Sequence, residues 1–177
     1  IGGEALGDGE RLAVVGEHLV GIAAPTGGLV WAGILFGLGL GGFFDGIMLH
    51  QIFQAHAMLS AKIPTNTMEN MQTNMTADGV FHMVTWLATA IGIVLLWRAV
   101  TRRGTILSGR ALFGSALFGW GLFNLVEGVI DHHLLGLHHV VERLGVSIWD
   151  WLFLASGVLL IVIGWAMMRN PRDAQAV

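Results

Sequence analysis

The sequence predicts an all-α integral membrane protein, folded as a four-helix bundle with a 2+2 internal repeat. Apolar residues make up 54% of its 177 residues and charged residues only 12%, about half the roughly 25% found in soluble domains. Four apolar stretches are each long enough for a hydrocarbon core, which needs roughly 20 residues per helix. Such long runs lack the alternation in segments of about ten residues that a membrane β-barrel requires.

We expect the four spans at residues 28–49, 79–97, 111–130 and 148–168. A polar N-terminal tail would cover residues 1–27, the transmembrane domain residues 28–168, and a cytoplasmic C-terminal tail residues 169–177. The first span carries Gly33, Gly37 and Gly41 at four-residue spacing. This spacing lets a second helix approach closely in lipid.

The basic residues predict an orientation. One end of the bundle carries six arginines, namely Arg98, Arg102, Arg103, Arg110, Arg169 and Arg172. The loops at the other end carry only Lys62 and Arg143. Because basic residues stay on the cytoplasmic side, both termini should be cytoplasmic and the loops 50–78 and 131–147 should lie outside the cytoplasm.

Composition also limits the partners and cofactors. The chain has no cysteine, which excludes disulfides, thiolate metal sites and iron–sulfur clusters. Its net charge of -3 gives no reason to expect nucleic acid as a partner. The lipid bilayer is the expected surrounding, with other membrane subunits or a homo-oligomer as open possibilities.

A repeated pattern links the two halves of the chain. Asp45-Gly46 is followed by His50 and then His56, and Glu127-Gly128 is followed by His132 and then His138 at the same spacings. Two spans separate the copies, which predicts a pseudo-twofold axis along the membrane normal.

Alternating helix direction brings the acids and histidines of all four spans to the non-cytoplasmic end. We predict a metal site there, with these residues as ligands or orienting partners: His50, His82, His132, Asp45, Asp78, Glu127 and Asp131.

Charge balance is the reason to expect a metal. Five acids lie in this layer, namely Asp45, Asp78, Glu127, Asp131 and Asp150, yet the spans contain no Lys or Arg. Crowded carboxylates cannot all stay ionised without a compensating positive charge, so either a metal ion or captured protons must supply it. Imidazole beside carboxylate suits copper, zinc, iron or nickel. We therefore favour a transition metal ion as cofactor.

Simpler interpretations exist for several of these residues. Asp78 and Asp150 each begin a predicted span and could cap the helix. Histidines near the membrane surface are often solvated loop residues; this interpretation is preferred for His133 and His139 and left open for His56 and His138.

The outer loop gives a hint about the metal. Met68, Met71 and Met75 fall on one helical face, and thioethers suit Cu(I). An amphipathic surface helix would show the same pattern. Copper is the favoured metal, with zinc and iron as alternatives.

Three motifs resemble one known family. They are the segments 41–51 (GGFFDGIMLHQ), 78–82 (DGVFH) and 119–128 (GWGLFNLVEG) continuing to His138-His139, and they resemble the bacterial multipass membrane proteins classed as domain of unknown function 2243. The resemblance implies a protein of the bacterial inner membrane and no settled activity. A loose genomic association of such relatives with copper-oxidase assembly factors also favours copper.

The leading hypothesis is a metal-binding membrane protein that handles copper or carries out metal-dependent redox chemistry. A haem-bearing electron-transfer subunit, with His50 and His132 as axial ligands, is an alternative, although an apolar haem pocket would not favour several carboxylates. An accessory subunit of a larger membrane complex is another. The residues assign no reaction, so whether the protein is an enzyme stays open.

Overall fold

A computed structural model describes residues 27–104 and 107–169. Most of the two tails expected at residues 1–27 and 169–177 therefore lies outside the described residues. Within the described part the protein is helical and contains no strand. Four helices are long and apolar enough to cross a membrane, which confirms the predicted fold class.

Each of the first and third spans consists of an α-helix that continues into a π-helical segment. Helix α2 (Gly27–Phe44) leads into η1 (Asp45–Ile52), and α4 (Gly109–Glu127) leads into η2 (Gly128–Leu134). The second and fourth spans are α3 (Met68–Thr101) and α5 (Ile148–Arg169), and a short 3-10 turn, η3 (Glu142–Leu144), precedes α5.

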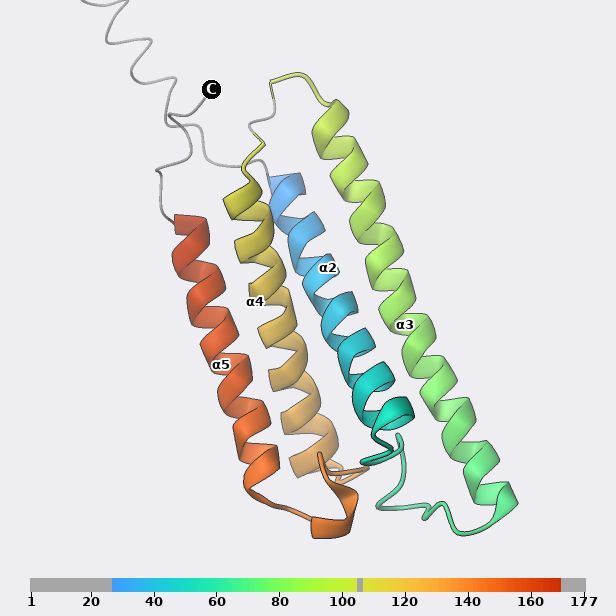
Figure 1. The fold of residues 1–177 in the computed structure, drawn as a ribbon. Coiled ribbons are helices and arrows are strands. Elements are labelled where there is room, and N and C mark those ends of the chain that lie inside the picture. The colour runs from blue at the N-terminus through green and yellow to red at the C-terminus, as the bar shows by residue number, and fades with distance from the viewer. Residues whose placement is uncertain (1–26, 105–106, 170–177) are drawn as a thin grey trace, which may run out of the picture.

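The four helices are arranged around a central pair. Helices α2 and α4 pack on each other, α3 packs on α2, and α5 packs on α4, as Figure 1 shows. The two loops that follow η1 and η2 lie at the same end of the molecule (Figure 1). The span order therefore brings both π-helical segments and the starts of α3 and α5 together.

Glycines allow the central pair to pack at backbone distance. A Cβ atom on Gly37 would overlap the carbonyl oxygen of Ala116, and one on Gly119 would overlap the carbonyl oxygen of Ile34. Large apolar side chains instead point outward, and Trp31, for example, is 61% exposed. This is the arrangement expected in lipid, where small residues mediate helix contact.

Helix α3 begins at Met68, well before the predicted start at residue 79. The side chain of Thr67 accepts a hydrogen bond from the Asn70 amide and so caps the helix. The buried Asn74 accepts from the Leu59 amide and donates to the Ile63 carbonyl, which ties the preceding loop to the helix. A polar segment is helical here because of its caps and loop contacts rather than its hydropathy.

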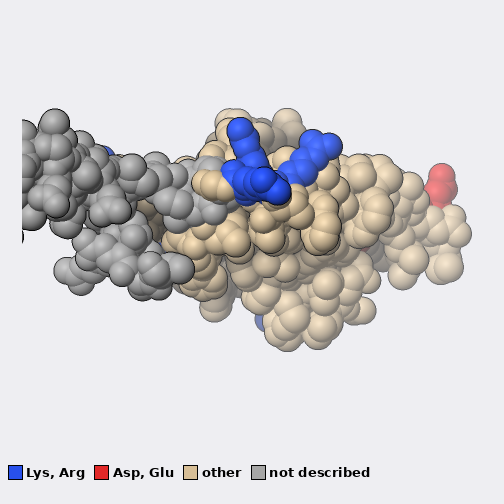
Figure 2. Space-filling view, turned by 90° about the horizontal axis from the view of Figure 1, so that it is seen from above, with Lys and Arg blue, Asp and Glu red and all other residues tan. Residues whose placement is uncertain are grey.

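The end of the molecule opposite the two loops is basic. Figure 2 looks onto this end and shows lysine or arginine side chains gathered there. The distribution agrees with the one from which the orientation was predicted; the orientation itself and the 2+2 internal repeat stay predictions.

Candidate metal centre

The π-helical turn brings the first acid and histidine of the site together. In an α-helix, residues five apart point about 140° away from each other. The wider turn of η1, in which the amide of Phe53 donates to the carbonyl of Met48, lines up residues at this spacing. As a result, Nε2 of His50 lies 3.0 Å from Oδ2 of Asp45.

The second half of the chain contains the same arrangement. In η2 the amide of Leu135 donates to the carbonyl of Ile130 across five residues. Glu127 and His132 flank this turn, and their ligand atoms lie within 4.8 Å of each other and of His138.

Two further histidines enter from the loops. Nδ1 of His56 lies 3.1 Å from the carbonyl oxygen of Val140, and Nδ1 of His138 lies 3.0 Å from the carbonyl oxygen of Met58. The two rings stack with their centroids 4.5 Å apart and their planes at 5°. Because Nδ1 donates to a carbonyl in each case, Nε2 carries the free lone pair.

These six side chains form what we call the cluster: Asp45, His50, His56, Glu127, His132 and His138. All of them are at least 95% buried. They contain three overlapping triads whose ligand atoms lie within 4.8 Å of one another, and these are His50–His56–His138, Glu127–His132–His138 and Asp45–His50–Glu127.

Two aspartates lie behind histidines of the cluster: Asp78 is hydrogen-bonded to His50, and Asp150 approaches His132 without a hydrogen bond. Oδ1 of Asp78 lies 2.9 Å from Nδ1 of His50, and Oδ1 of Asp150 lies 3.3 Å from Nδ1 of His132. Each also accepts a hydrogen bond from a loop amide, Asp78 from Met58 and Asp150 from Val140. A carboxylate that holds the distal nitrogen of a ligating histidine is the usual support of a protein metal site.

The polar atoms that face the interior lack partners. Within the described residues, both carboxylate oxygens of Asp45 and of Glu127 have no hydrogen-bond partner, nor does Nε2 of His50, His56, His132 or His138. The close ion-pair contacts of the described carboxylates all involve histidine. Nε2 of His50 and Oδ2 of Asp45 lie close to each other, but buried polar groups normally have well-aligned hydrogen-bond partners. These eight converging atoms therefore form a set that could hold a metal ion.

The loop histidines are neutral. Burial, together with the neighbouring His138 and His50, lowers the pKa of His56 to about 3. Burial also lowers the pKa of His138. Both rings are therefore deprotonated at neutral pH, which is the form that binds a metal.

The seven predicted site residues are placed in three ways. Asp45, His50, Glu127 and His132 belong to the cluster, while Asp78 contacts it through His50. His82 and Asp131 belong to none of the triads. Nδ1 of His82 turns back to the carbonyl oxygen of Asp78, 2.7 Å away.

Sequence reasoning left His56 and His138 undecided and treated Asp150 as a possible cap. Asp150 does accept from the amide and hydroxyl of Ser147, so it caps α5 and approaches His132 at once. The signal that could have selected the two loop histidines was their equal spacing after Asp45 and Glu127.

The fold and the cluster define a multipass membrane protein with a buried histidine and carboxylate layer at one end. The chain matches the family described as "Predicted membrane protein (DUF2243)" over residues 32–171 and belongs to it. No curated protein matches the chain, and no solved structure does.

Proposed function

We propose that this protein binds a transition metal in the cluster and uses it for redox chemistry or metal handling at one face of the bacterial inner membrane. The observation that carries the proposal is the convergence of four imidazole Nε2 atoms and two carboxylates, all buried and without hydrogen-bond partners. Such a set is costly to bury unless something binds it.

The type of ligand narrows the choice of metal. Imidazole and carboxylate together suit copper(II), zinc and iron. Calcium and magnesium prefer oxygen ligands alone, so four imidazoles argue against them. Copper remains our favoured metal; Met68, Met71 and Met75 are exposed on α3, so the preference rests on the histidines and not on these thioethers.

The ligands occur in pairs at a constant spacing of 82 positions, and this supports the internal repeat. Asp45 corresponds to Glu127, His50 to His132 and His56 to His138. The contacts correspond as well, because His56 binds the carbonyl of Val140 and His138 that of Met58. Each half supplies two imidazoles and one carboxylate, and we infer two metal ions per chain.

Charge balance agrees with two ions. Asp45 and Glu127 in the cluster, with Asp78 and Asp150 behind the histidines, are the four carboxylates that contact its imidazoles, and they offer four negative charges. Asp131, the fifth acid of the layer, is half-buried and makes none of these contacts. Two divalent ions would neutralise four carboxylates. A single ion would leave two negative charges in a layer where the described carboxylates find no Lys or Arg within ion-pair distance.

The orientation of the site follows from the positive-inside rule. Arginines gather at the end of the helices opposite the cluster (Figure 2). We propose that this basic end is cytoplasmic, with both termini, and that the cluster faces the other side of the membrane.

The packing of the cluster disfavours the haem alternative. The ring centroids of His50 and His56 are 4.3 Å apart, and those of His132 and His138 are 4.9 Å apart. A porphyrin would have to separate these rings and would meet two buried carboxylates. An absorption spectrum of the purified protein tests this directly, since a Soret band would reverse the conclusion.

Elemental analysis of natively purified protein tests the proposal. We expect two transition-metal ions per chain in the wild type, and loss of both in a His56→Ala/His138→Ala double variant. His133→Ala is the control, because His133 lies outside the triads, with Nδ1 2.7 Å from the carbonyl oxygen of Gly128. Protein that is folded but free of metal, and that takes up none on dialysis, would refute the metal site.

A further inference from the structure

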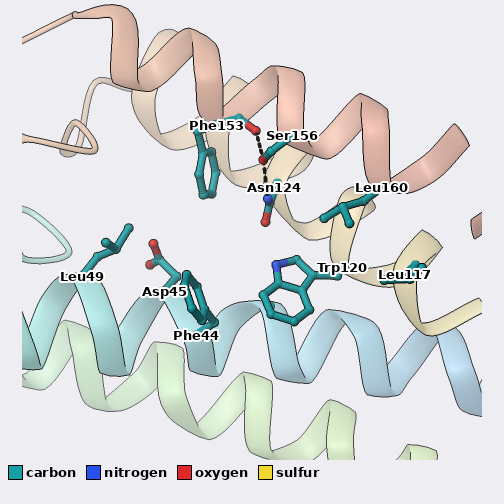
Figure 3. Close-up of a pocket in the computed structure, with 10 residues that line it drawn as sticks. Phe44, Asp45, Leu49, Leu117, Trp120, Asn124, Phe153, Ser156 and Leu160 are labelled. Atoms are coloured by element: carbon teal, nitrogen blue, oxygen red, sulfur yellow. Dashed lines mark hydrogen bonds between the residues drawn. The ribbon is translucent and has the colours of Figure 1, made fainter. Parts of the chain in front are cut away.

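A pocket of about 310 Å³ lies between α2, α4 and α5 and reaches the cluster (Figure 3). This volume is at the lower end of the range for small-molecule sites. Its lining is mostly apolar and includes Phe44, Asp45, Leu117, Trp120, Asn124 and Leu160. Asp45 is the one cluster residue in this lining, so the pocket and the candidate metal centre share a wall.

The lining carries a small group of polar atoms. Asn124 donates from Nδ2 to the hydroxyl of Ser156 at 2.9 Å, and Ser156 donates to the carbonyl of Phe153 at 2.6 Å. These bonds fix the amide of Asn124, whose side-chain oxygen faces the pocket, as does the indole nitrogen of Trp120 (Figure 3). Apart from Asp45, which the pocket shares with the cluster, the pocket thus offers one neutral acceptor and one donor, which together match a hydroxyl group.

The position of the pocket identifies where its ligand comes from. All ten lining residues belong to the candidate membrane spans, and Phe44 at its edge is 50% exposed. In a membrane this surface is covered by lipid. A molecule that enters the pocket from the side therefore arrives dissolved in the bilayer.

The matching position in the other half of the chain is filled. Phe123 lies 82 positions after Gly41, and its ring packs against Phe81 at a centroid distance of 6.0 Å. Phe81 follows Asp78 on α3 by three residues, as Phe153 follows Asp150 on α5. On the α5 side the position is Gly41, and the pocket is present there. On the α3 side the corresponding position is Phe123, whose ring occupies the equivalent space.

We propose that the pocket binds an apolar molecule dissolved in the bilayer that carries one hydroxyl group, such as a medium-chain alcohol. The hydroxyl donates to the oxygen of Asn124 and accepts from the indole N–H of Trp120, and the apolar part lies along Leu117 and Leu160. Binding needs only the pocket. The role of this molecule as substrate of the metal centre rests on the proposed function.

Photolabelling of the chelator-treated protein in lipid nanodiscs tests the binding. The probe is decanol with a diazirine in its chain, and labelled residues are mapped by mass spectrometry. We expect saturable labelling of pocket residues that excess decanol displaces. An equal concentration of decane should displace it about tenfold less well, because decane makes neither of the two hydrogen bonds.

Two variants at neighbouring positions supply a matched control. Leu160→Trp places a larger side chain in the pocket and should abolish the saturable labelling, whereas Leu159→Trp, at a 59% exposed position outside the lining, should leave it unchanged. Asn124→Leu should remove the advantage of decanol over decane and keep the pocket.

The proposal is overturned by labelling that does not saturate, that is equal in both tryptophan variants, or that decane displaces as well as decanol. Because the protein is stripped of metal, none of these outcomes depends on the metal site. Elemental analysis alone decides that part, so the two proposals fail separately.

Discussion

Replacing His138 with alanine should separate the role of the cluster in metal binding from its role in folding. His138 is completely buried and belongs to two of the three triads. Its Nδ1 satisfies the carbonyl of Met58 at 3.0 Å, while its Nε2 lies 3.5 Å from Oε1 of Glu127 and has no hydrogen-bond partner. The change therefore removes one structural hydrogen bond and one proposed metal ligand.

The structural cost follows from the lost bond. Leaving the carbonyl of Met58 buried and unsatisfied should cost about 1–3 kcal/mol in the free energy of unfolding of the metal-free protein. Removing a buried nitrogen that has no hydrogen-bond partner is favourable, and this partly offsets the free-energy cost of the cavity that the ring leaves. We therefore expect the metal-free variant to fold, with a modestly lower stability.

The cost to metal binding should be larger. Loss of an orienting residue that does not touch the metal typically lowers affinity 10–100-fold, so loss of a direct ligand should exceed about 100-fold, or roughly 2.7 kcal/mol. With metal at about 1,000 times the wild-type dissociation constant, binding at one of the two proposed sites stabilises the wild type by about 4 kcal/mol. The same concentration should stabilise the variant by only about 1.4 kcal/mol.

The assay is denaturant unfolding in detergent micelles, with metal and with chelator, for wild type and variant. The quantity of interest is the difference between the two conditions, which cancels the structural cost. His133→Ala, which alters a half-buried ring packed 4.8 Å from Trp151, should keep the full metal-dependent stabilisation. Equal metal-dependent stabilisation in wild type and His138→Ala would refute the assignment of His138 as a ligand.

Three further predictions test other parts of the structure. Gly37→Ala should lower the free energy of unfolding by about 1–3 kcal/mol, because the added Cβ would overlap the backbone of α4. Gly28→Ala should change it little, because its Cβ would lie 3.8 Å from the nearest side-chain atom. Equal effects of the two changes in denaturant unfolding would contradict the helix contact. Asp78→Asn should weaken metal binding about 10–100-fold by loosening His50, and chelator competition that detects no change would contradict the orienting role. In the metal-free protein the imidazole of His56 should stay neutral from pH 8 to pH 5, because its pKa is lowered to about 3. The contribution of the neutral ring to the free energy of unfolding is full above about pH 6.5 and is lost as the pH falls toward 3. NMR signals of this ring that titrate near pH 6.5 would contradict its burial.

Hydropathy was enough to predict the spans but not the ends of the helices. Spans one, three and four differ from their predicted bounds by a few residues. Helix α3 begins far earlier because Thr67 caps it and Asn74 anchors a loop to it. Neither effect leaves a hydropathy signal, so a polar segment of this kind reads as loop in the sequence.

The candidate site was predictable where its residues lie on spans. Asp45 and His50 end the first span, and Glu127 and His132 end the third. These two spans run in the same direction because one span separates them, so topology alone brings the four residues to one layer. The π-helical turns were not predictable, because residues five apart diverge on the α-helix that periodicity assumes. Those turns decide which side chains converge.

His56 and His82 show two different limits of predicting the site from the sequence. His56 lies in a loop, where the sequence gives no geometry, yet its ring stacks on His138 in the centre of the cluster. His82 lies on a span, four residues after Asp78, and shares its helical face. Its ring, however, is pressed against Gly46, where an added Cβ would lie 2.6 Å from Nε2, and its Nδ1 is held by the backbone of its own helix.

The two halves of the chain have matching residues at the proposed ligand positions but different residues beside the pocket. If the paired contacts served only to hold the helices together, the large and small residues beside them would be expected to follow the same pairing. Instead, position 41 is glycine where position 123 is phenylalanine, and a pocket opens on one side next to Asp45. A centre that receives a molecule from the bilayer needs one entrance, and a second would admit lipid to a dry cluster of carboxylates and imidazoles. If the proposed metal ions and the bilayer ligand both bind, filling one side with Phe123 and leaving the other open next to Asp45 would give the paired site an entrance on the α5 side.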